Sequence, residues 1–309
     1  MKEQVFCTVI SRFRLYQAIA LFCSLNEVIK DHITYVLCVD DETHRLISKM
    51  GWRRIRLLHI CELNESLNKL KKNRRINEYC WTLKPLLIEA VFSRDPGIYR
   101  VTYVDADLFF FSDPSVIFKN QPSCSVLLSR GDIVIPSLEP ENKKKLQALL
   151  GKYNSGFISF KRDETGLNCL RWWKKRCLES CVSKPEAGLF GDQKYLDEMP
   201  SKFSSVCEIH TPGVNIGHWN RALYHYSISD GKILAGGNRL ICYHFSGFRV
   251  LRSNRIIMIH EQKSVDPPFF YYIYLRILQD VIRNISLIDP GFDGYSDAQD
   301  LARRESEKS

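Results

Sequence analysis

The amino-acid sequence predicts an α/β protein with a central, mostly parallel sheet flanked by helices, and a helical appendage at the C-terminal end. Short apolar runs alternate with amphipathic helical patterns over the first hundred residues, as strands and helices do in a parallel sheet. The 309 residues, 45% of them hydrophobic, are enough to bury a large core. No window approaches eighteen consecutive apolar residues, so we expect no membrane-spanning helix.

In the N-terminal third, continuous apolar runs predict four strands, and the segments between them predict helices. The strands are expected at residues 5–10, 33–40, 55–63 and 99–111, and the helices at 14–29, at 40–51 and from near Pro85. Acidic residues open the helix at 40–51 and Gly51 closes it, which is a common capping pattern.

The remaining two thirds are less regular. They predict strands at 123–129 and 153–162, helices at 140–152, 165–181, 191–199 and 267–286, and a hairpin at 231–245 that turns at Gly236 and Gly237. We therefore expect one domain over residues 1–255, a helical appendage over 256–297 and a charged, disordered tail over 298–309.

The eleven cysteines are scattered through apolar runs, and no two show a zinc-like C-x-x-C spacing. The N-terminal residues enter the first strand without a basic, apolar and cleavable leader, so we expect a reducing, cytoplasmic compartment. The cysteines are therefore predicted to fill the core as free thiols rather than to form disulfides or bind metal.

The net charge of +9 fits nucleic acid, an anionic membrane or a phosphate-bearing substrate. The basic residues occur in short bursts such as "WRRIR" and "KLKKNRR", and no nucleic-acid-binding motif accompanies them. We therefore predict no nucleic-acid partner, because a phosphate-bearing substrate or a membrane surface fits the surplus charge better.

The stretch "YVDADLFFFSDP" places Asp105 and Asp107 in an otherwise apolar run. In an extended segment, residues two apart point the same way, so both carboxylates can meet one ligand. Two hard oxygen donors suit Mg²⁺ or Mn²⁺ together with substrate phosphates, and ligands of open parallel sheets bind at the carboxyl ends of strands. An acidic turn explains the pair equally well.

Four segments in order resemble motifs of family 8 glycosyltransferases, which have the Rossmann-like GT-A fold. "RVTYVDADLFFFSDP" is similar to their D-x-D segment, "YNSGFISFKRD" to their N-[AS]-G strand, "GDQKYLDEMP" to their D-Q helix and "YHFSGF" to their late His-[FY]-x-G element. The resemblance covers residues 1 to about 250. It implies a retaining enzyme that uses a divalent metal to neutralise the diphosphate of a nucleotide sugar.

The resemblance gives Asp105, Asp107 and His244 as metal ligands. This mixed oxygen and nitrogen set fits Mn²⁺ better than Mg²⁺, because imidazole is a poor Mg²⁺ ligand. Mg²⁺ is the alternative. Asp192 and Gln193 match the family's catalytic positions, with the Gln193 amide beneath the anomeric carbon. Asp192 also matches a sugar-binding position, as does Asn154.

At the nucleotide end, the resemblance places Thr8 on the base and Tyr16 against uracil, although "SRFR" replaces the acidic residues that the family has there. Gly247 allows a backbone N–H to approach a phosphate. The family's basic residue after this element is missing, and Arg249 is expected to replace it, with Arg252 as the alternative. Lys84 can reach a phosphate, or it is a surface lysine whose stem lies along the protein.

Two further segments combine aromatic and polar residues. The loop "TPGVNIGHWN" resembles a loop of bacterial glycosyltransferase-like sequences, which assigns Asn215 and Trp219 to donor or acceptor contacts; Trp219 as a core anchor is the alternative. The aromatic and basic helix at 267–286 suits an anionic membrane surface, where a lipid-linked acceptor is presented. Packing of this helix against the domain or a second subunit remains open.

Together these features predict a metal-dependent glycosyltransferase that moves a hexose, with retention, from a UDP-sugar to a hydroxyl of a surface glycan or lipopolysaccharide-type acceptor. It is expected in the cytoplasm, with a possible peripheral place on the inner face of the membrane. One alternative is a sugar-1-phosphate nucleotidyltransferase, although the loop after the first strand contains no glycine to cradle a triphosphate. The other is a non-catalytic nucleotide-sugar or glycan-binding module.

Overall fold

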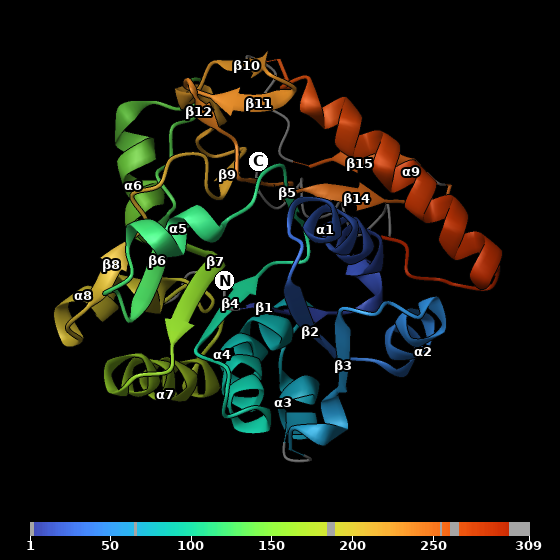
Figure 1. Cartoon of the computed structure of the whole chain (residues 1–309), viewed down its shortest axis with the longest axis horizontal. Coiled ribbons are helices and arrows are strands. Elements are labelled where there is room, and N and C mark those ends of the chain that lie inside the picture. Colours follow the sequence, from blue (N-terminus) through green and yellow to red (C-terminus); the bar gives the residue numbers. More distant parts are fainter. Residues whose placement is uncertain (1–2, 65–66, 184–188, 254, 260–265, 297–309) are drawn as a thin grey trace.

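A seven-stranded sheet forms the centre of the protein, with strand order β3-β2-β1-β4-β7-β6-β8 (Figure 1). The computed structural model describes residues 3–64, 67–183, 189–253, 255–259 and 266–296. The strands of this sheet are β1 (Gln4–Ile10), β2 (His32–Cys38), β3 (Ile55–His59), β4 (Arg100–Val104), β6 (Val126–Arg130), β7 (Tyr153–Lys161) and β8 (Val206–Glu208).

The sheet is mixed but mostly parallel. Strands β1 to β4 pair in parallel and β8 pairs in parallel with β6, whereas β7 runs antiparallel to both β4 and β6. Because β7 is reversed, its first residues lie beside the carboxyl end of β4, where the Asp105 N–H donates to the Gly156 carbonyl at 2.8 Å. The predicted α/β architecture is confirmed.

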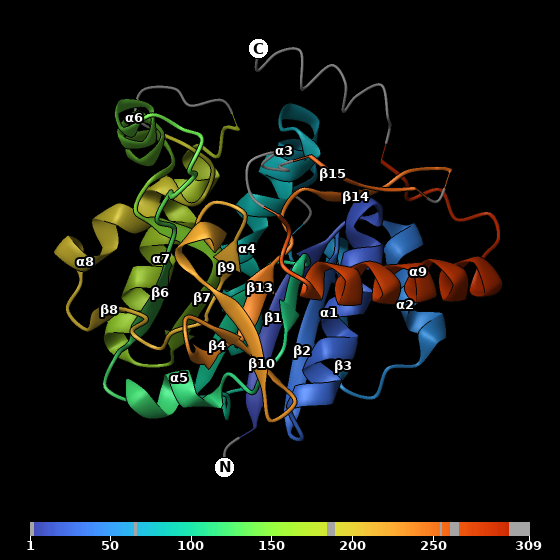
Figure 2. The ribbon, with the colours of Figure 1, turned by 90° about the horizontal axis from the view of Figure 1, so that it is seen from above.

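Helices cover both faces of the sheet (Figures 1 and 2). Side chains of β1 alternate between two cores: Phe6 and Ile10 join the core that contains α1 and α9, and Cys7 joins the core that contains α4 and α7. The helices are α1 (Leu15–Val28), α2 (Asp41–Met50), α3 (Leu67–Asn73), α4 (Ile76–Arg94), α5 (Ser115–Asn120), α6 (Pro140–Leu150), α7 (Glu164–Glu179), α8 (Met199–Lys202) and α9 (Phe270–Ile288).

The predicted start of α4 near Pro85 is wrong, because the helix begins at Ile76 and carries Pro85 in its interior. Proline removes one backbone donor from a helix, but the helix buries Tyr79, Leu83 and Leu87 against the sheet. This apolar burial stabilises the turns on both sides of the proline.

The predicted single strand at 99–111 is also wrong. Strand β4 ends at Val104, the chain turns through residues 105–107, and β5 (Leu108–Phe110) starts a second sheet. That sheet has the order β5-β13-β9, with β13 at Cys242–His244 and β9 at Ile216–Gly217. Its register pairs His244 with Leu108, so the late histidine is brought to the turn between the two sheets.

The remaining strands form two small sheets. Strands β11 (Lys232–Ala235) and β12 (Asn238–Arg239) form the predicted hairpin around Gly236 and Gly237, with β10 (Tyr226–Ser229) beside it; β14 (Phe248–Val250) pairs with β15 (Ile256–Met258). Four 3₁₀ turns complete the described elements: η1 (Arg12–Arg14), η2 (Ile60–Glu62), η3 (Lys194–Glu198) and η4 (Arg221–Leu223). The predicted helix at 191–199 is thus mainly a 3₁₀ turn.

The prediction that all cysteines are free thiols is wrong for two of them. Cys124 and Cys207 form a disulfide between the segment before β6 and the edge strand β8. Side-by-side pairing of β6 and β8 brings these distant positions together, which spacing along the chain could not reveal. The other nine cysteines are free, and six of them are buried.

Helix α9 packs against α1, and its Phe270, Tyr271 and Tyr274 are buried in the same core (Figure 2). The aromatic residues of this helix were expected to face a membrane, the domain or a second subunit, and these three face the domain. None of the described helices is long and apolar enough to cross a membrane. The domain boundary at residue 255 stays a prediction, and the predicted disordered tail at 298–309 lies outside the described residues.

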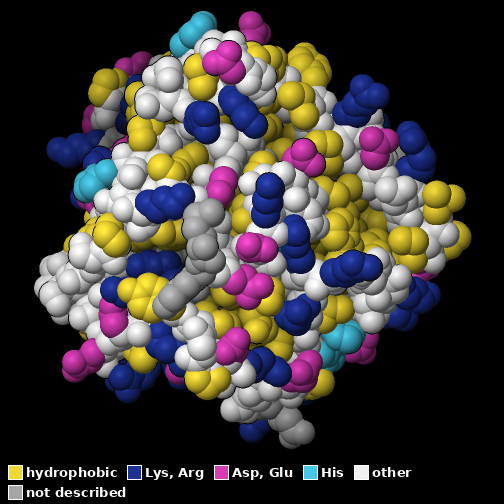
Figure 3. All heavy atoms as spheres, viewed as in Figure 1, with side chains coloured by type: hydrophobic (Ala, Val, Ile, Leu, Met, Phe, Trp, Pro, Cys, Tyr) yellow, Lys and Arg dark blue, Asp and Glu magenta, His cyan; other side chains and the backbone are white. Residues whose placement is uncertain are grey.

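Basic side chains are scattered among acidic and apolar ones on the face seen in Figure 3, rather than gathered into one stripe. This distribution agrees with the basic bursts in the sequence. The predicted absence of a nucleic-acid partner stays a prediction.

Candidate active site

Two carboxylates and one imidazole converge where the two main sheets meet. One ligand atom each from Asp105, Asp107 and His244 lies within 4.8 Å of the other two. His244 Nε2 is 3.0 Å from Asp107 Oδ1 and 3.8 Å from Asp105 Oδ2. The two aspartates meet through the turn after β4 and not through strand alternation, which corrects the geometric reason for pairing them.

The donor set of this triad fits a divalent cation. It combines hard carboxylate oxygens with one imidazole nitrogen, a set that Mn²⁺ accepts readily. Burial alone raises the pKa of Asp107, but the adjacent His244, helped by Arg14 and Arg249, lowers it well below its ordinary value. Asp107 is therefore ionised at neutral pH, as a metal ligand must be.

Lys84 joins the triad to the neighbouring Asp192. Its side chain is 1% exposed, and its Nζ lies 3.0 Å from Asp105 Oδ1, 3.3 Å from Asp192 Oδ2 and 3.0 Å from Ser155 Oγ. The alternative of a surface lysine is therefore wrong. Burial lowers the pKa of Lys84, but Asp105 and Asp192 outweigh this effect and raise it above the ordinary value.

Among the described residues, Lys84 is the cation that opposes the effect of burial on Asp192. Its burial raises the pKa of the carboxyl, Lys84 opposes that shift, and the negative charge of Asp105 adds to it, so the pKa stays above its ordinary value. An acid this buried needs a positive partner to remain ionised. The short turn before η3 holds Asp192 in place, since its carbonyl accepts from the buried Trp173 Nε1 at 3.0 Å.

Asn154 and Gln193 meet beside these charges. Asn154 Nδ2 donates to Gln193 Oε1 at 3.1 Å, and Gln193 Nε2 donates to the Leu150 carbonyl at 2.8 Å. Asn154 Oδ1 accepts from the Gly156 N–H at 2.9 Å. Strand β7 and the turn before η3 thus bring together the residues that the resemblance assigned to the donor sugar.

Asn215 and Trp219 lie behind and beside His244. Asn215 is fully buried, and its Oδ1 is 3.0 Å from His244 Nδ1. The Trp219 ring packs edge-on against the His244 ring, with centroids 5.2 Å apart. The Trp219 ring also lies so close to Gly217 that a Cβ at that position would be 2.4 Å from it. Trp219 Nε1 is buried and finds no acceptor among the described residues.

The nucleotide end differs from the sequence prediction. Tyr16 is 1% exposed, because its ring is covered by Phe292 and Tyr295, each with its ring centroid 5.7 Å away. The segment that carries these rings returns to the domain, and the Ser296 N–H donates to the Val250 carbonyl at 2.8 Å. A base therefore cannot stack on Tyr16 in this structure.

Thr8 lies in β1 and is fully buried, with a hydroxyl that finds no partner among the described residues. Thr8, like Tyr16, is not exposed to solvent in this structure. Its contact with a base stays a prediction.

Arg14 is a residue that the sequence reasoning missed. Arg14 and Arg249 both donate to the Phe248 carbonyl, at 3.5 and 2.6 Å, and both lie near enough to Asp107 to lower its pKa. Gly247, which immediately precedes Phe248, has φ +97°, a conformation that favours glycine. The basic "SRFR" segment, which replaced the family's acidic residues, was the signal for a second arginine here.

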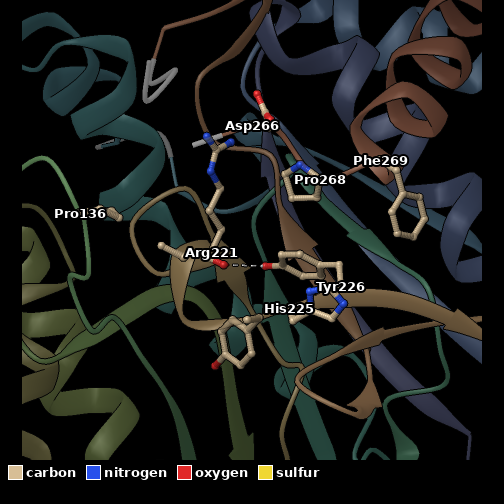
Figure 4. A pocket seen from close by; sticks show the side chains of 9 residues that line it. Pro136, Arg221, His225, Tyr226, Asp266, Pro268 and Phe269 are labelled. Carbon is tan, nitrogen blue, oxygen red and sulfur yellow. Dashed lines mark hydrogen bonds between the residues drawn. The ribbon is translucent and has the colours of Figure 1, made fainter. Parts of the chain in front are cut away.

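A cavity of about 430 Å³ opens beside the loop that carries Trp219 (Figure 4). The Val134 N–H donates to the Trp219 carbonyl at 2.6 Å, which ties the Pro136 side of the cavity to this loop. The lining residues are Pro136, Arg221, Ala222, Tyr224, His225, Tyr226, Asp266, Pro268 and Phe269.

Comparison with known proteins identifies the family. The family described as nucleotide-diphospho-sugar transferase matches residues 31–206, which is more than half of the chain. The chain belongs to this family. It is a nucleotide-sugar-dependent glycosyltransferase, and the predicted resemblance to glycosyltransferases is confirmed.

Two proteins of Bacillus subtilis (strain 168) are similar to this glycosyltransferase. "Uncharacterized protein YfnF" is 52% identical over 297 residues, covering 96% of this chain and 98% of the relative. "Uncharacterized protein YfnD" is 29% identical over 298 residues, covering 94% of this chain and 93% of the relative.

Solved structures with a similar arrangement are more distant. Mouse xyloside xylosyltransferase 1 in its apo form has a TM-score of 0.48 at 14% identity, covering 82% of this chain and 99% of that one. The galactosyltransferase LgtC, with donor and acceptor sugar analogues, has a TM-score of 0.49 at 13% identity, covering 79% and 87%. Family membership rests on the match to residues 31–206, because likeness at these scores is weak.

Proposed function

We propose that this glycosyltransferase moves a hexose from a UDP-sugar to a hydroxyl of a surface glycan or lipopolysaccharide-type acceptor, with retention. The observation that carries the proposal is the convergence of Asp105, Asp107 and His244 beside Asn154 and the Asp192–Gln193 turn. The three ligand residues would hold Mn²⁺, or Mg²⁺, which when bound neutralises charge on the departing diphosphate.

The donor sugar would lie over Asn154, Asp192 and Gln193. A carboxylate accepts from sugar hydroxyls, and an amide offers both a donor and an acceptor. The Gln193 amide is held by Leu150 and Asn154 and is a feeble nucleophile, so it suits stabilisation of an oxocarbenium-like state rather than a covalent intermediate. This supports attack by the acceptor on the same face that the diphosphate leaves.

The diphosphate would be received by Arg14, Arg249 and the backbone at Gly247. Two guanidinium groups fixed on one carbonyl form a preorganised anion site. Trp219 Nε1, a buried donor without an acceptor among the described residues, supports its assignment to a donor or acceptor contact.

The donor and its metal can be tested directly. Purified protein incubated with a panel of UDP-hexoses and Mn²⁺ is expected to release UDP slowly by hydrolysis, faster when an oligosaccharide acceptor is present, and to stop on chelation with EDTA. The anomeric configuration of the product, read by NMR, is expected to match that of the donor. Failure of every UDP-hexose to be consumed with Mn²⁺, or turnover unchanged by EDTA, would overturn the proposal.

The cavity beside Trp219 supports an acceptor site. Tyr224, Tyr226 and Phe269 offer aromatic surface and His225 and Asp266 offer polar groups, which together suit a sugar ring with its hydroxyls. Segment 221–226 follows directly on the loop that packs against His244. The acceptor sugar would therefore approach the donor from this side.

We expect the double variant His225→Ala/Phe269→Ala to reduce transfer to the acceptor about tenfold, the loss of about 1.4 kcal/mol of binding. Hydrolysis of the UDP-hexose by water should remain at the wild-type rate, because neither side chain belongs to the metal or donor site. Parallel assays of transfer and hydrolysis distinguish the two. Equal losses in both reactions would show that the cavity serves the donor or the fold instead.

Contact with a membrane is supported only by exposed residues at the two ends of α9. Tyr272 and Ile273 near its start are 69% and 42% exposed, and Leu287 near its end is 77% exposed. A lipid-linked acceptor and a cytoplasmic place at the inner face remain part of the proposal on this basis.

A further inference from the structure

We propose that Asn215 is a positioning residue that fixes the ring orientation and tautomer of the metal ligand His244. The sequence assigned Asn215 to a sugar contact, whereas the structure gives it a fully buried side chain whose polar atoms all bond to protein groups. The inference rests on the proposed metal site and names the side chain that orients one of its ligands.

A backbone N–H shows which side-chain atoms of Asn154 and Asn215 are donors and which are acceptors. The Gly156 N–H donates to the Asn154 side chain at 2.9 Å, and a backbone N–H can only meet an acceptor, so that atom is the Asn154 oxygen. The Asn215 atom 2.9 Å from the same oxygen must then be its NH₂ group. The chain of contacts thereby sets which way the Asn215 amide points.

The remaining Asn215 atom faces the imidazole. Its Oδ1 is 3.0 Å from His244 Nδ1, and an amide oxygen only accepts, so Nδ1 must carry a hydrogen and donate it. With a hydrogen on Nδ1, Nε2 is the ring atom that faces Asp107 and Asp105, at 3.0 and 3.8 Å, and it is the atom that can offer a lone pair to a metal ion in exchange for its own proton. Metal-bound histidines are commonly held by such a bond at the second ring nitrogen.

Packing stops the ring from adopting the other orientation. A Cβ on Gly156 would lie 2.4 Å from His244 Cε1, and Trp219 packs against the ring from another direction. The second Asn215 N–H is held by the Ser129 hydroxyl at 2.8 Å. Asn215 itself has φ +53°, a left-handed conformation that asparagine tolerates better than most residues.

The test measures Mn²⁺ binding without any sugar donor, from the electron paramagnetic resonance signal of free Mn²⁺. Asn215→Gly keeps the left-handed backbone and removes the side chain. We expect its affinity for Mn²⁺ to fall about 10–100-fold, the usual effect of losing a group that orients a metal ligand. The glycine variant carries the test, because Asn215→Asp would keep an acceptor against Nδ1 but would also set a carboxylate oxygen against the Asn154 oxygen.

A double-mutant cycle separates positioning from general damage. In a His244→Ala background there is no ring to orient, so Asn215→Gly should cause no further loss of Mn²⁺ affinity. Equal losses in both backgrounds, or unchanged affinity in Asn215→Gly, would each overturn the proposal. If wild-type protein does not bind Mn²⁺ at all, the metal-dependent function fails with it, whereas binding that depends on Asp107 but not on Asn215 refutes only the positioning role.

Discussion

Replacement of Lys84 by methionine is expected to lower the free energy of unfolding by about 3–5 kcal/mol, the usual cost of removing one partner of a buried charge pair. The methionine fills much of the same space, so the loss is mainly electrostatic. Lys84 is the cation that Asp105 and the buried Asp192 share, and without it both carboxylates are left with less compensation. Urea unfolding of the purified variant measures the change.

The variant should also become sensitive to pH. Burial raises the pKa of Asp192 in the folded protein, and loss of Lys84 removes the charge that opposes this shift. A raised folded-state pKa means that the folded protein binds more protons than the unfolded chain between the two pKa values, so stability falls as pH rises through that window. The deficit of Lys84→Met should therefore shrink as the pH is lowered through this window, from the raised folded-state pKa of Asp192 down toward its unfolded-state pKa.

A matched control is Lys174→Met. Lys174 bonds to Glu89 at 2.6 Å between α7 and α4, but both side chains are partly exposed, and pairs of that kind contribute about 0–1 kcal/mol. If Lys84→Met costs no more than this control, Lys84 is not the shared counter-ion of the site.

Lys84 shows what sequence reasoning could not reach. Its three partners lie on the turn after β4, on β7 and on the turn before η3, and local pattern says nothing about which distant elements meet. The predicted stacking of Tyr16 on uracil was wrong for the same reason, because the rings that cover Tyr16 come from residues 292 and 295, far away along the chain. The disulfide between Cys124 and Cys207 likewise depends on strand pairing.

The order of motifs along the chain did allow the chemistry of the site to be predicted. The four motifs predicted Asp105, Asp107 and His244 as one metal set, and these residues do converge. The predicted backbone geometry was wrong, because the apolar run predicted an extended strand through both aspartates and the chain instead turns between them. Asn215 was chosen as a functional residue from its loop, but only its burial and its bond to His244 indicate what it does.

Replacement of Asp107 by asparagine is expected to abolish metal-dependent turnover, with a loss of at least about 100-fold in the rate of UDP-hexose consumption. Neutralising charge on a departing diphosphate is worth several kcal/mol, and each 1.36 kcal/mol is about tenfold in rate. An amide keeps the shape of the carboxylate but carries no charge, so Mn²⁺ affinity should fall together with activity. Both are measurable on one preparation.

Asp113→Asn provides the matched control, because it makes the same chemical change in the same stretch of sequence. Asp113 Oδ1 accepts from the Ser115 N–H at 2.8 Å at the start of α5 and from Gln4 Nε2 at 3.1 Å, and the amide oxygen of asparagine can accept both bonds, so the change should cost little stability. Its Mn²⁺ affinity and turnover should stay at the wild-type level. If Asp107→Asn keeps wild-type Mn²⁺ affinity, or if Asp113→Asn loses as much, the charge that binds the cation lies elsewhere.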